Sequence, residues 1–378
     1  HVKRTLPEEY TVAASGKLLT KSDMERLSIT NNDEKSKNSN TETPKQSSGK
    51  MKTLEYVMEN VHDFAWFADK NYIVDKDSVL LPHSGKKVTT WAFYVAEQEE
   101  LWEKTTHYIN DAVYFYSEKV GDYPFEHCTA LAGPLGSGGG MEYPGITIIG
   151  DTRDSITLNQ VIMHEVGHNW FYAILGSNER AYPFLDEGIN SYYEMQYMLS
   201  RYPELELQDF MGASEFFASL TDIESIPYYQ YYFIPYEIAA KINFDQSSLL
   251  HSNDYNMFNY FGITDLKNTF PLNYLKEYVD EKHMDEAMQN YYEQWKFRHP
   301  YPEDFRKSIE EKLDVEVSWF FDQLLPTTRK VDYKIKRVKG DSAFIVNSGN
   351  IQSPFVLDGI KDSKKTFSKW YEPITDDA

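Results

Sequence analysis

The amino-acid sequence predicts a multidomain α+β protein, because strand-like patterns at both ends enclose a long helical middle. The first 96 residues alternate polar and apolar side chains over short stretches such as KKVTTWAFYV (86–95), as strands do. From residue 97 to residue 325 apolar side chains recur mostly at helical spacing. Alternation then returns in VDYKIKRVKGDSAFIVNSG (331–349), which predicts a final β segment.

These changes of pattern place the expected domain boundaries. We expect an N-terminal β domain over 1–96, a central domain over 97–204, a helical domain over 205–325 and the start of a C-terminal β segment over 326–378. Residues 28–50 carry few apolar side chains and are predicted to form a solvated polar insert. The C-terminal β segment is too short to close a sandwich or barrel, so we expect the chain to be part of a longer protein.

Composition excludes several classes of function. A net charge of −21 argues against a nucleic-acid partner, which requires a basic surface. The chain has no apolar run of the ~18 residues that a transmembrane helix needs, and no apolar signal region opens it. Cys128 is the single cysteine, so no internal disulfide forms.

The motif HEVGH carries the first chemical signal. It places His164 and His168 four residues apart, with Glu165 next to the first. On a helix, residues four apart lie about 40° apart around the axis and ~6 Å along it, so both imidazoles can reach one metal ion. Glu165 lies ~100° around the helix, where it can contact a metal-bound water without being a ligand.

A third ligand is predicted on the next helix. Catalytic zinc takes three protein ligands and a water, and two histidines with one glutamate are a known set. Glu187 follows His168 by nineteen residues, and Gly176 and Pro183 mark a turn between two predicted antiparallel helices. We therefore predict His164, His168 and Glu187 as ligands of one Zn²⁺. Glu194, further along the second helix, is either a partner of a ligand or a surface carboxylate.

Three segments together resemble a known family. GGGMEYPG, HEVGHNWF and NERAYPFLDEGINSYYE resemble the M1 family of zinc aminopeptidases, which are gluzincins, and YYEQWKFRHPYPEDF (291–305) is similar to its bacterial branch. The resemblance covers about residues 55–325. It implies a thermolysin-like catalytic domain preceded by a β domain and followed by a helical domain. It also implies export from the cell, as in bacterial relatives.

The glycine-rich segment GPLGSGGGMEYPG (133–145) acquires a role through this resemblance. In the family, the glutamate of the Gly-x-Met-Glu motif binds the free α-ammonium group of the substrate, and Glu142 matches it. Gly139 and Gly140 are expected to leave room for the substrate backbone. Tyr143 stands where many family members have asparagine, which we interpret as a difference between subgroups.

A second departure from the family concerns the group that stabilises the oxyanion. The family has a tyrosine two residues before a lysine, and alignment on Lys267 puts Asp265 at the tyrosine position. An ionised aspartate repels a developing oxyanion. Either Tyr260 or Tyr255 takes the role, or the hydrolase is slow or altered, or the protein is a zinc-binding pseudoenzyme that captures peptides.

The leading functional hypothesis is a zinc aminopeptidase acting on peptides with a free N-terminus. Glu165 would take a proton from a zinc-bound water and deliver it to the leaving amine. A zinc endopeptidase is the nearest enzymatic alternative, and Glu142 argues against it. A peptide-binding protein with a vestigial site is the alternative from another class, and Asp265 favours it.

Overall fold

The computed structural model describes residues 1–33, 47–135, 139–211 and 226–373. Contacts within the chain divide it into two compact units. The first unit comprises His1–Ser177, Tyr193–Tyr228 and Tyr292–His299, and the second comprises Asn178–Tyr192, Tyr229–Tyr291 and Pro300–Ala378. The helix α5 (Glu187–Arg201) begins in the second unit and ends in the first.

The first unit begins with two small antiparallel sheets. One has the order β1-β4-β3, formed by Val2–Pro7, Met51–Val57 and Lys17–Leu18, and the other pairs β2 (Thr11–Ala14) with β5 (Trp66–Asp69). Alternate inward-facing side chains of these strands form a buried cluster around Leu54 and Tyr56. The helix α1 (Lys21–Asp33) extends into the first residues of the predicted polar insert. Residues 34–46 of the insert lie outside the described part.

A five-stranded mixed sheet follows, in the order β6-β7-β8-β10-β9. Its strands are Ile73–Leu80, Lys87–Tyr94, His127–Ala132, Ile146–Ile149 and, at one edge, Gly140–Tyr143. β8 runs parallel to both β7 and β10, while β9 pairs antiparallel with β10. All four side chains of β10 are buried, as expected of a strand covered on both faces. The sheet joins strands from both sides of the predicted boundary at residue 96.

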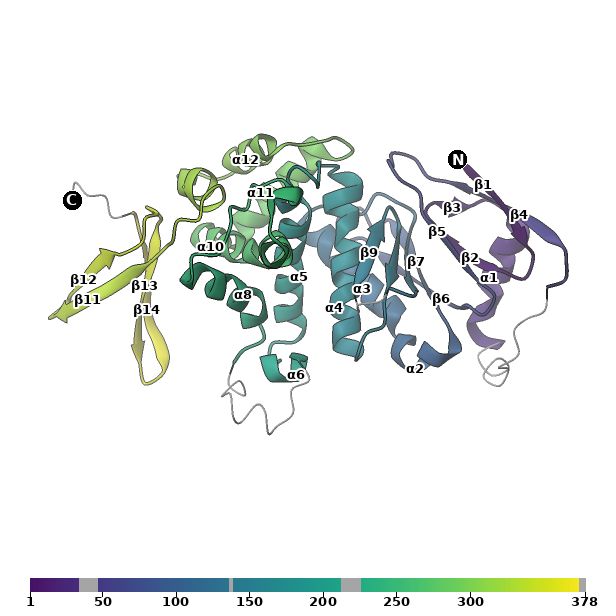
Figure 1. Ribbon diagram of the computed structural model, residues 1–378, viewed down its shortest axis with the longest axis horizontal. Helices are drawn as coiled ribbons and strands as arrows, with labels where there is room; N and C mark the ends of the chain where they lie inside the picture. Colours follow the sequence, from purple (N-terminus) through teal and green to yellow (C-terminus); the bar gives the residue numbers. More distant parts are fainter. Residues whose placement is uncertain (34–46, 136–138, 212–225, 374–378) are drawn as a thin grey trace. The chain divides into compact units, whose positions relative to one another are not determined.

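Two long helices pack on this sheet, α3 (Thr105–Lys119) and α4 (Ser155–His168), after the short η1 (Ala96–Gln98) and α2 (Glu99–Trp102) (Figure 1). Asp154 caps α4 by accepting a hydrogen bond from the backbone N–H of Thr157 at 2.8 Å. The helix predicted to run to Gly176 instead changes at His168 into a π-helical turn, η2 (Asn169–Ile174). Such wider turns often occur at functional sites. The first unit also contains α6 (Leu207–Met211).

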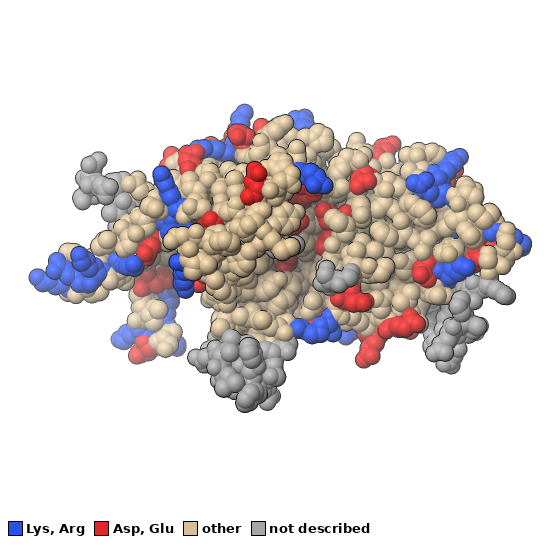
Figure 2. Space-filling model, in the orientation of Figure 1, with Lys and Arg blue, Asp and Glu red and all other residues tan. Residues whose placement is uncertain are grey.

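The second unit is mainly helical and ends in two β-hairpins. Its helices are η3 (Pro183–Leu185), α8 (Gln230–Lys241), η5 (Ser252–Asp254), α9 (Met257–Phe261), η6 (Gly262–Lys267), α10 (Thr269–Val279), α11 (Glu281–Trp295, ending in the first unit), α12 (Pro302–Glu310) and η7 (Trp319–Leu324). The hairpins pair β11 (Tyr333–Lys339) with β12 (Ser342–Asn347) and β13 (Phe355–Lys361) with β14 (Lys364–Tyr371). Lysine and arginine side chains gather on these hairpins (Figure 2).

This architecture confirms the predicted fold class: β sheets at the N-terminus, a mixed α/β centre, a helical region and C-terminal strands. Among the residues that the structure describes, no helix combines the length and the hydropathy needed to cross a membrane.

Candidate functional site: a histidine and carboxylate cluster

The two histidines of HEVGH direct their Nε2 nitrogens toward a common point. In the first unit, Nε2 of His164 and Nε2 of His168 lie 3.1 Å apart near the end of α4. Two nitrogens that bind one tetrahedral zinc at ~2.0–2.1 Å lie about 3.3 Å from each other. The spacing of the pair therefore fits a shared zinc ion.

The other ring nitrogen of His164 is held by a carboxylate. Nδ1 of His164 lies 2.8 Å from Oε2 of Glu194, and the Nε2 amide of Gln160 donates to Oε1 of the same carboxylate at 2.6 Å. A carboxylate that accepts from Nδ1–H keeps the Nε2 lone pair available for a metal. Glu194 was expected to be either a partner of a zinc ligand or a surface carboxylate. The structure supports the first interpretation, because the side chain is buried and contacts His164, a predicted ligand.

Two further carboxylates converge on His168. His168, Glu165 and Glu142 each offer one potential ligand atom, and these atoms lie within 4.8 Å of one another. All three side chains are buried, and Glu142 comes from the edge strand β9, which packs against α4. Two buried carboxylates so close together create a negative potential that favours a cation, either a metal ion or an ammonium group.

Gly140 is the point at which β9 approaches α4 most closely at Glu165. A Cβ atom built on Gly140 would lie 2.4–2.5 Å from the side chain of Glu165, well inside van der Waals contact. A Cβ on Gly139 would meet no atom within 4 Å. The sequence assigned both glycines to substrate binding; the structure shows that Gly140 also makes room for Glu165. Gly138 lies outside the described residues.

Asn169 connects the end of α4 to the turn after β9. Its Oδ1 accepts a hydrogen bond from the backbone N–H of Gly145 at 2.8 Å, and its Nδ2 donates to the carbonyl of Val166 at 2.9 Å. The strand that carries Glu142 is thereby tied to the helix that carries the histidines. Sequence reasoning missed Asn169 and Gln160, although Gln160 precedes His164 by four residues and so lies on the same helix face.

Glu187 lies in the second unit, as the first residue of α5. Its neighbour Gly188 packs tightly in that unit, because a Cβ there would lie 2.8 Å from the side chain of Asn268. Glu187 precedes Glu194 by seven residues, which is close to two helical turns. Both carboxylates therefore leave α5 on nearly the same face.

The structure separates the two tyrosines named for the oxyanion role. Tyr255 is buried, and its hydroxyl donates to the carbonyl of Ser247 at 2.8 Å. Tyr260, in α9, is 42% exposed. Asp265 lies in η6, where its Oδ1 accepts from the hydroxyl of Thr264 at 2.6 Å.

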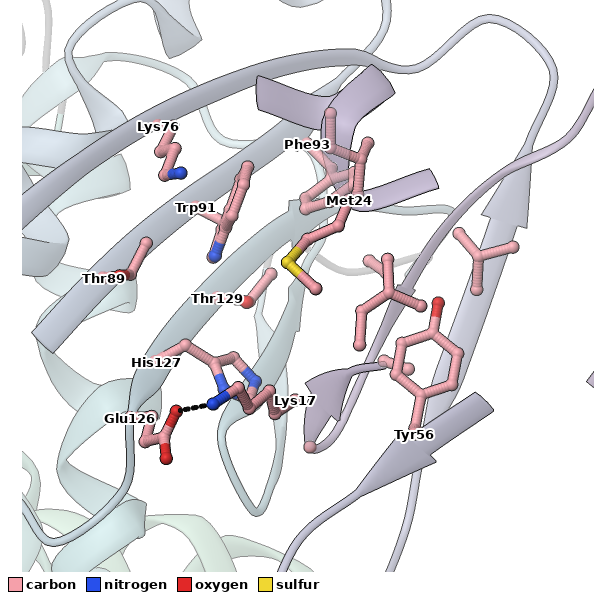
Figure 3. Close-up of a pocket in the computed structure, with 16 residues that line it drawn as sticks. Lys17, Met24, Tyr56, Lys76, Thr89, Trp91, Phe93, Glu126, His127 and Thr129 are labelled. Atoms are coloured by element: carbon pink, nitrogen blue, oxygen red, sulfur yellow. Dashed lines mark ion pairs between the residues drawn. The ribbon is translucent and has the colours of Figure 1, made fainter. Parts of the chain in front are cut away.

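A separate cavity of about 210 Å³ in the first unit contains none of the predicted site residues (Figure 3). It lies between the N-terminal strands and the face of β7 and β8, and Lys17 forms an ion pair with Glu126 at 2.8 Å beside it. His127 lines this cavity, and burial lowers the pKa of its imidazole to about 4. This imidazole is therefore neutral at pH 7.

Comparison with known proteins agrees with the geometry. Residues 104–324, more than half of the chain, match the model of the peptidase family M1 domain. The chain belongs to peptidase family M1. No curated protein matches the sequence.

Solved structures of similar fold come from the same family. An M1 zinc metallopeptidase from Deinococcus radiodurans has a TM-score of 0.59 at 15% identity, over 86% of this chain and 63% of that chain. A mutant of the Deinococcus radiodurans enzyme bound to a Tyr-Ser-Ala substrate has a TM-score of 0.55 at 14% identity, over 86% of this chain and 62% of that chain. The chain thus spans less than two thirds of the length of these structures, and at this identity the likeness shows the fold.

Proposed function

We propose that the protein is a zinc-dependent aminopeptidase that removes the N-terminal residue of peptides. The observation that carries the proposal is the cluster in the first unit, where two histidine nitrogens lie 3.1 Å apart and Glu165 and Glu142 converge on His168. Family membership supports a peptidase, and the donor set suits zinc.

The three zinc ligands in this proposal are His164, His168 and Glu187. The continuity of α5 supports the third ligand, because Glu194 on the same face already contacts His164. When bound, zinc lowers the pKa of a coordinated water and polarises the substrate carbonyl. Structural zinc sites use four cysteine or histidine ligands, so this set suits catalysis better.

Glu165 is the proposed general base. It takes a proton from water as the water oxygen bonds to the carbonyl carbon, and it passes this proton to the amide nitrogen as the C–N bond breaks. The products are a free amino acid and a peptide shortened by one residue. The contact between Gly140 and the side chain of Glu165 supports this role, because it positions the carboxylate beside His168.

Glu142 is the proposed anchor for the α-ammonium group of the substrate. Its carboxylate is buried near Glu165, and charge attraction in such a site discriminates strongly between a free and a blocked N-terminus. This preference distinguishes an aminopeptidase from an endopeptidase. Asp265 favours a second candidate, a peptide-binding pseudoenzyme, because an ionised carboxylate cannot donate to an oxyanion.

The deciding experiment compares aminoacyl-arylamides with N-acetylated peptides, with and without a zinc chelator. We expect turnover of the free-amine substrates only, lost with the chelator and restored by zinc. Glu165→Gln should retain zinc and lose turnover. Cleavage of acetylated peptides would show an endopeptidase, and peptide binding without turnover would show the pseudoenzyme.

A further inference from the structure

The hairpin that carries Glu142 has a turn whose type follows from its two central residues. The register of β9 and β10 pairs Tyr143 with Ile146, so Pro144 and Gly145 form a two-residue turn. Proline fixes φ at about −65° in the first position, and Gly145 has a φ of +74° in the second. This combination defines a type II turn, whereas the two-residue turns that suit the twist of a hairpin are types I′ and II′. The position of this hairpin therefore depends on contacts from outside it.

Asn169 supplies one of these contacts. In a type II turn the internal hydrogen bond uses the N–H of the fourth residue, so the turn itself provides no acceptor for the N–H of Gly145. Gly145 is buried, and this N–H therefore needs an acceptor from elsewhere in the protein. It donates to Oδ1 of Asn169 at 2.8 Å, and the carbonyl of Gly145 accepts from the backbone N–H of Thr129 in β8 at 3.0 Å. Both polar groups of the turn glycine are thus held from outside the hairpin.

The side chain of Asn169 is itself held in one orientation. It is 2% exposed, and its Nδ2 donates to the carbonyl of Val166 in α4 at 2.9 Å. With Nδ2 engaged in this way, Oδ1 is the amide atom that accepts from Gly145. Asn169 therefore joins the end of α4 to the turn of the hairpin by two hydrogen bonds of opposite sense.

The place of Asn169 in the chain gives this bridge its consequence. Asn169 directly follows His168, and Glu142 precedes Gly145 by three residues. Potential ligand atoms of His168 and Glu142 lie within 4.8 Å of each other. A shift of the turn relative to α4 would change this separation, and misplacement of a binding group by about 1 Å can cost up to ~10²-fold.

We propose that Asn169 is the positioning residue of the N-terminal anchor. It holds Glu142 at the distance from His168 at which the carboxylate receives the ammonium group of a peptide. Asn169 contacts no substrate in this proposal and acts only through Glu142. The proposal rests on the proposed function, in which Glu142 binds that ammonium group.

The first test measures peptide binding without turnover. Calorimetry gives the Kd of Leu-Gly-Gly and of its N-acetylated form for zinc-loaded proteins that carry Glu165→Gln, and the ratio of the two Kd values measures the preference for a free amine. Asn169→Ala should lower this preference by at least ~10-fold. Asn159→Ala is the matched control, because Asn159 is a fully buried amide of the same helix that bonds to Tyr197 and Tyr202. It should keep the preference of the parent protein.

A double-mutant cycle separates positioning of the anchor from a general loss of structure. Glu142→Gln should lower the preference by itself, and Asn169→Ala added to it should cause no further loss, because both residues act through the same contact. A preference in Asn169→Ala equal to that of the parent would overturn the proposal. A loss of the same size in the presence and absence of Glu142→Gln would also overturn it.

Hydrogen exchange tests the bridge independently of any peptide. The amides of residues 140–147 should exchange at least ~10-fold faster in Asn169→Ala than in the parent, because the N–H of Gly145 loses its acceptor. In Asn159→Ala they should exchange at the parent rate, and unchanged exchange in Asn169→Ala would overturn the proposal. If exchange rises as expected but the parent binds both peptides equally, the proposed function fails, while Asn169 remains the residue that positions Glu142.

Discussion

At the scale of single residues, the absence of a side chain at Gly140 matters as much as the presence of one at Glu165. Without a Cβ at residue 140, β9 can lie against α4 while the carboxylate of Glu165 stays near His168. Its neighbour Gly139 has open space where a Cβ would lie. The two adjacent glycines therefore have different physical roles.

Gly140→Ala should lower kcat by ~10², because the new methyl group would displace Glu165, the proposed general base. Gly139→Ala is the matched variant, because its methyl group would meet no protein atom within 4 Å; any effect there should appear in KM, since Gly139 is proposed to leave room for the substrate backbone. Steady-state kinetics and zinc analysis of both proteins check this. Equal kcat values for the two variants would contradict the role assigned to Gly140.

Glu194 should act on zinc through His164. Glu194→Gln removes the charge that holds Nδ1 of His164, and loss of such a partner weakens metal affinity by ~10–100-fold. Competition with a fluorescent chelator measures the zinc Kd. The exposed Glu204 provides a control carboxylate, and Glu204→Gln should bind zinc as wild type does. A wild-type Kd in Glu194→Gln would remove Glu194 from the site.

At the scale of elements, His127 joins strands from two sheets of the first unit. Its ring bonds to the backbone of Ala14 in β2 while its own backbone belongs to β8, and burial lowers the pKa of the imidazole from 6.5 to about 4. As the pH falls, His127 of the unfolded chain therefore binds a proton near pH 6.5, whereas His127 of the folded chain binds one only near pH 4. The contribution of neutral His127 to the free energy of unfolding is complete above pH 6.5 and is lost as the pH falls from 6.5 to about 4.

The protonation of His127 in the unfolded chain changes the free energy of unfolding by up to about 3 kcal/mol across this pH range. His127→Gln should have a lower free energy of unfolding than wild type at pH 7. Between pH 6.5 and 4, this free energy should fall less steeply in the variant than in wild type. Urea unfolding of both proteins at several pH values isolates this contribution from that of the carboxylates, which both proteins share. Parallel stability curves would show that His127 does not titrate as inferred.

At the scale of the whole molecule, the predicted ligands lie on elements of both units. His164 and His168 end α4 in the first unit, whereas Glu187 begins α5 in the second. A metal held by all three would bind the folded chain and not the unfolded one. Zinc at 1,000 times its Kd would then add about 4 kcal/mol to the free energy of unfolding.

Removal of zinc by a chelator should therefore lower the Tm, and added zinc should restore it. His168→Ala should have a lower Tm that neither treatment changes, because one ligand is missing. Differential scanning calorimetry at fixed protein concentration measures both. A Tm of wild type that does not respond to the chelator would contradict a zinc site of this affinity.

Several features could be predicted from sequence because their physical cause is local. The alternation of side chains indicated β7, and the spacing in HEVGH placed both histidines on one face of α4. The change to η2 after His168 was not predictable, since apolar spacing continues through Asn169–Ile174 without a break. The helix α1 was not predicted, because it carries few apolar side chains.

By itself the sequence determined the family, the fold class and the convergence of His164 and His168, since helix geometry relates residues four apart whatever surrounds them. Only the tertiary structure decided that Glu194 holds His164 and that Gly140 meets Glu165. It also decided that Tyr255, and not Tyr260, gives its hydroxyl to Ser247. These contacts join residues on separate strands, helices and loops. They depend on how those elements pack together, and the spacing of residues along the chain does not encode that packing.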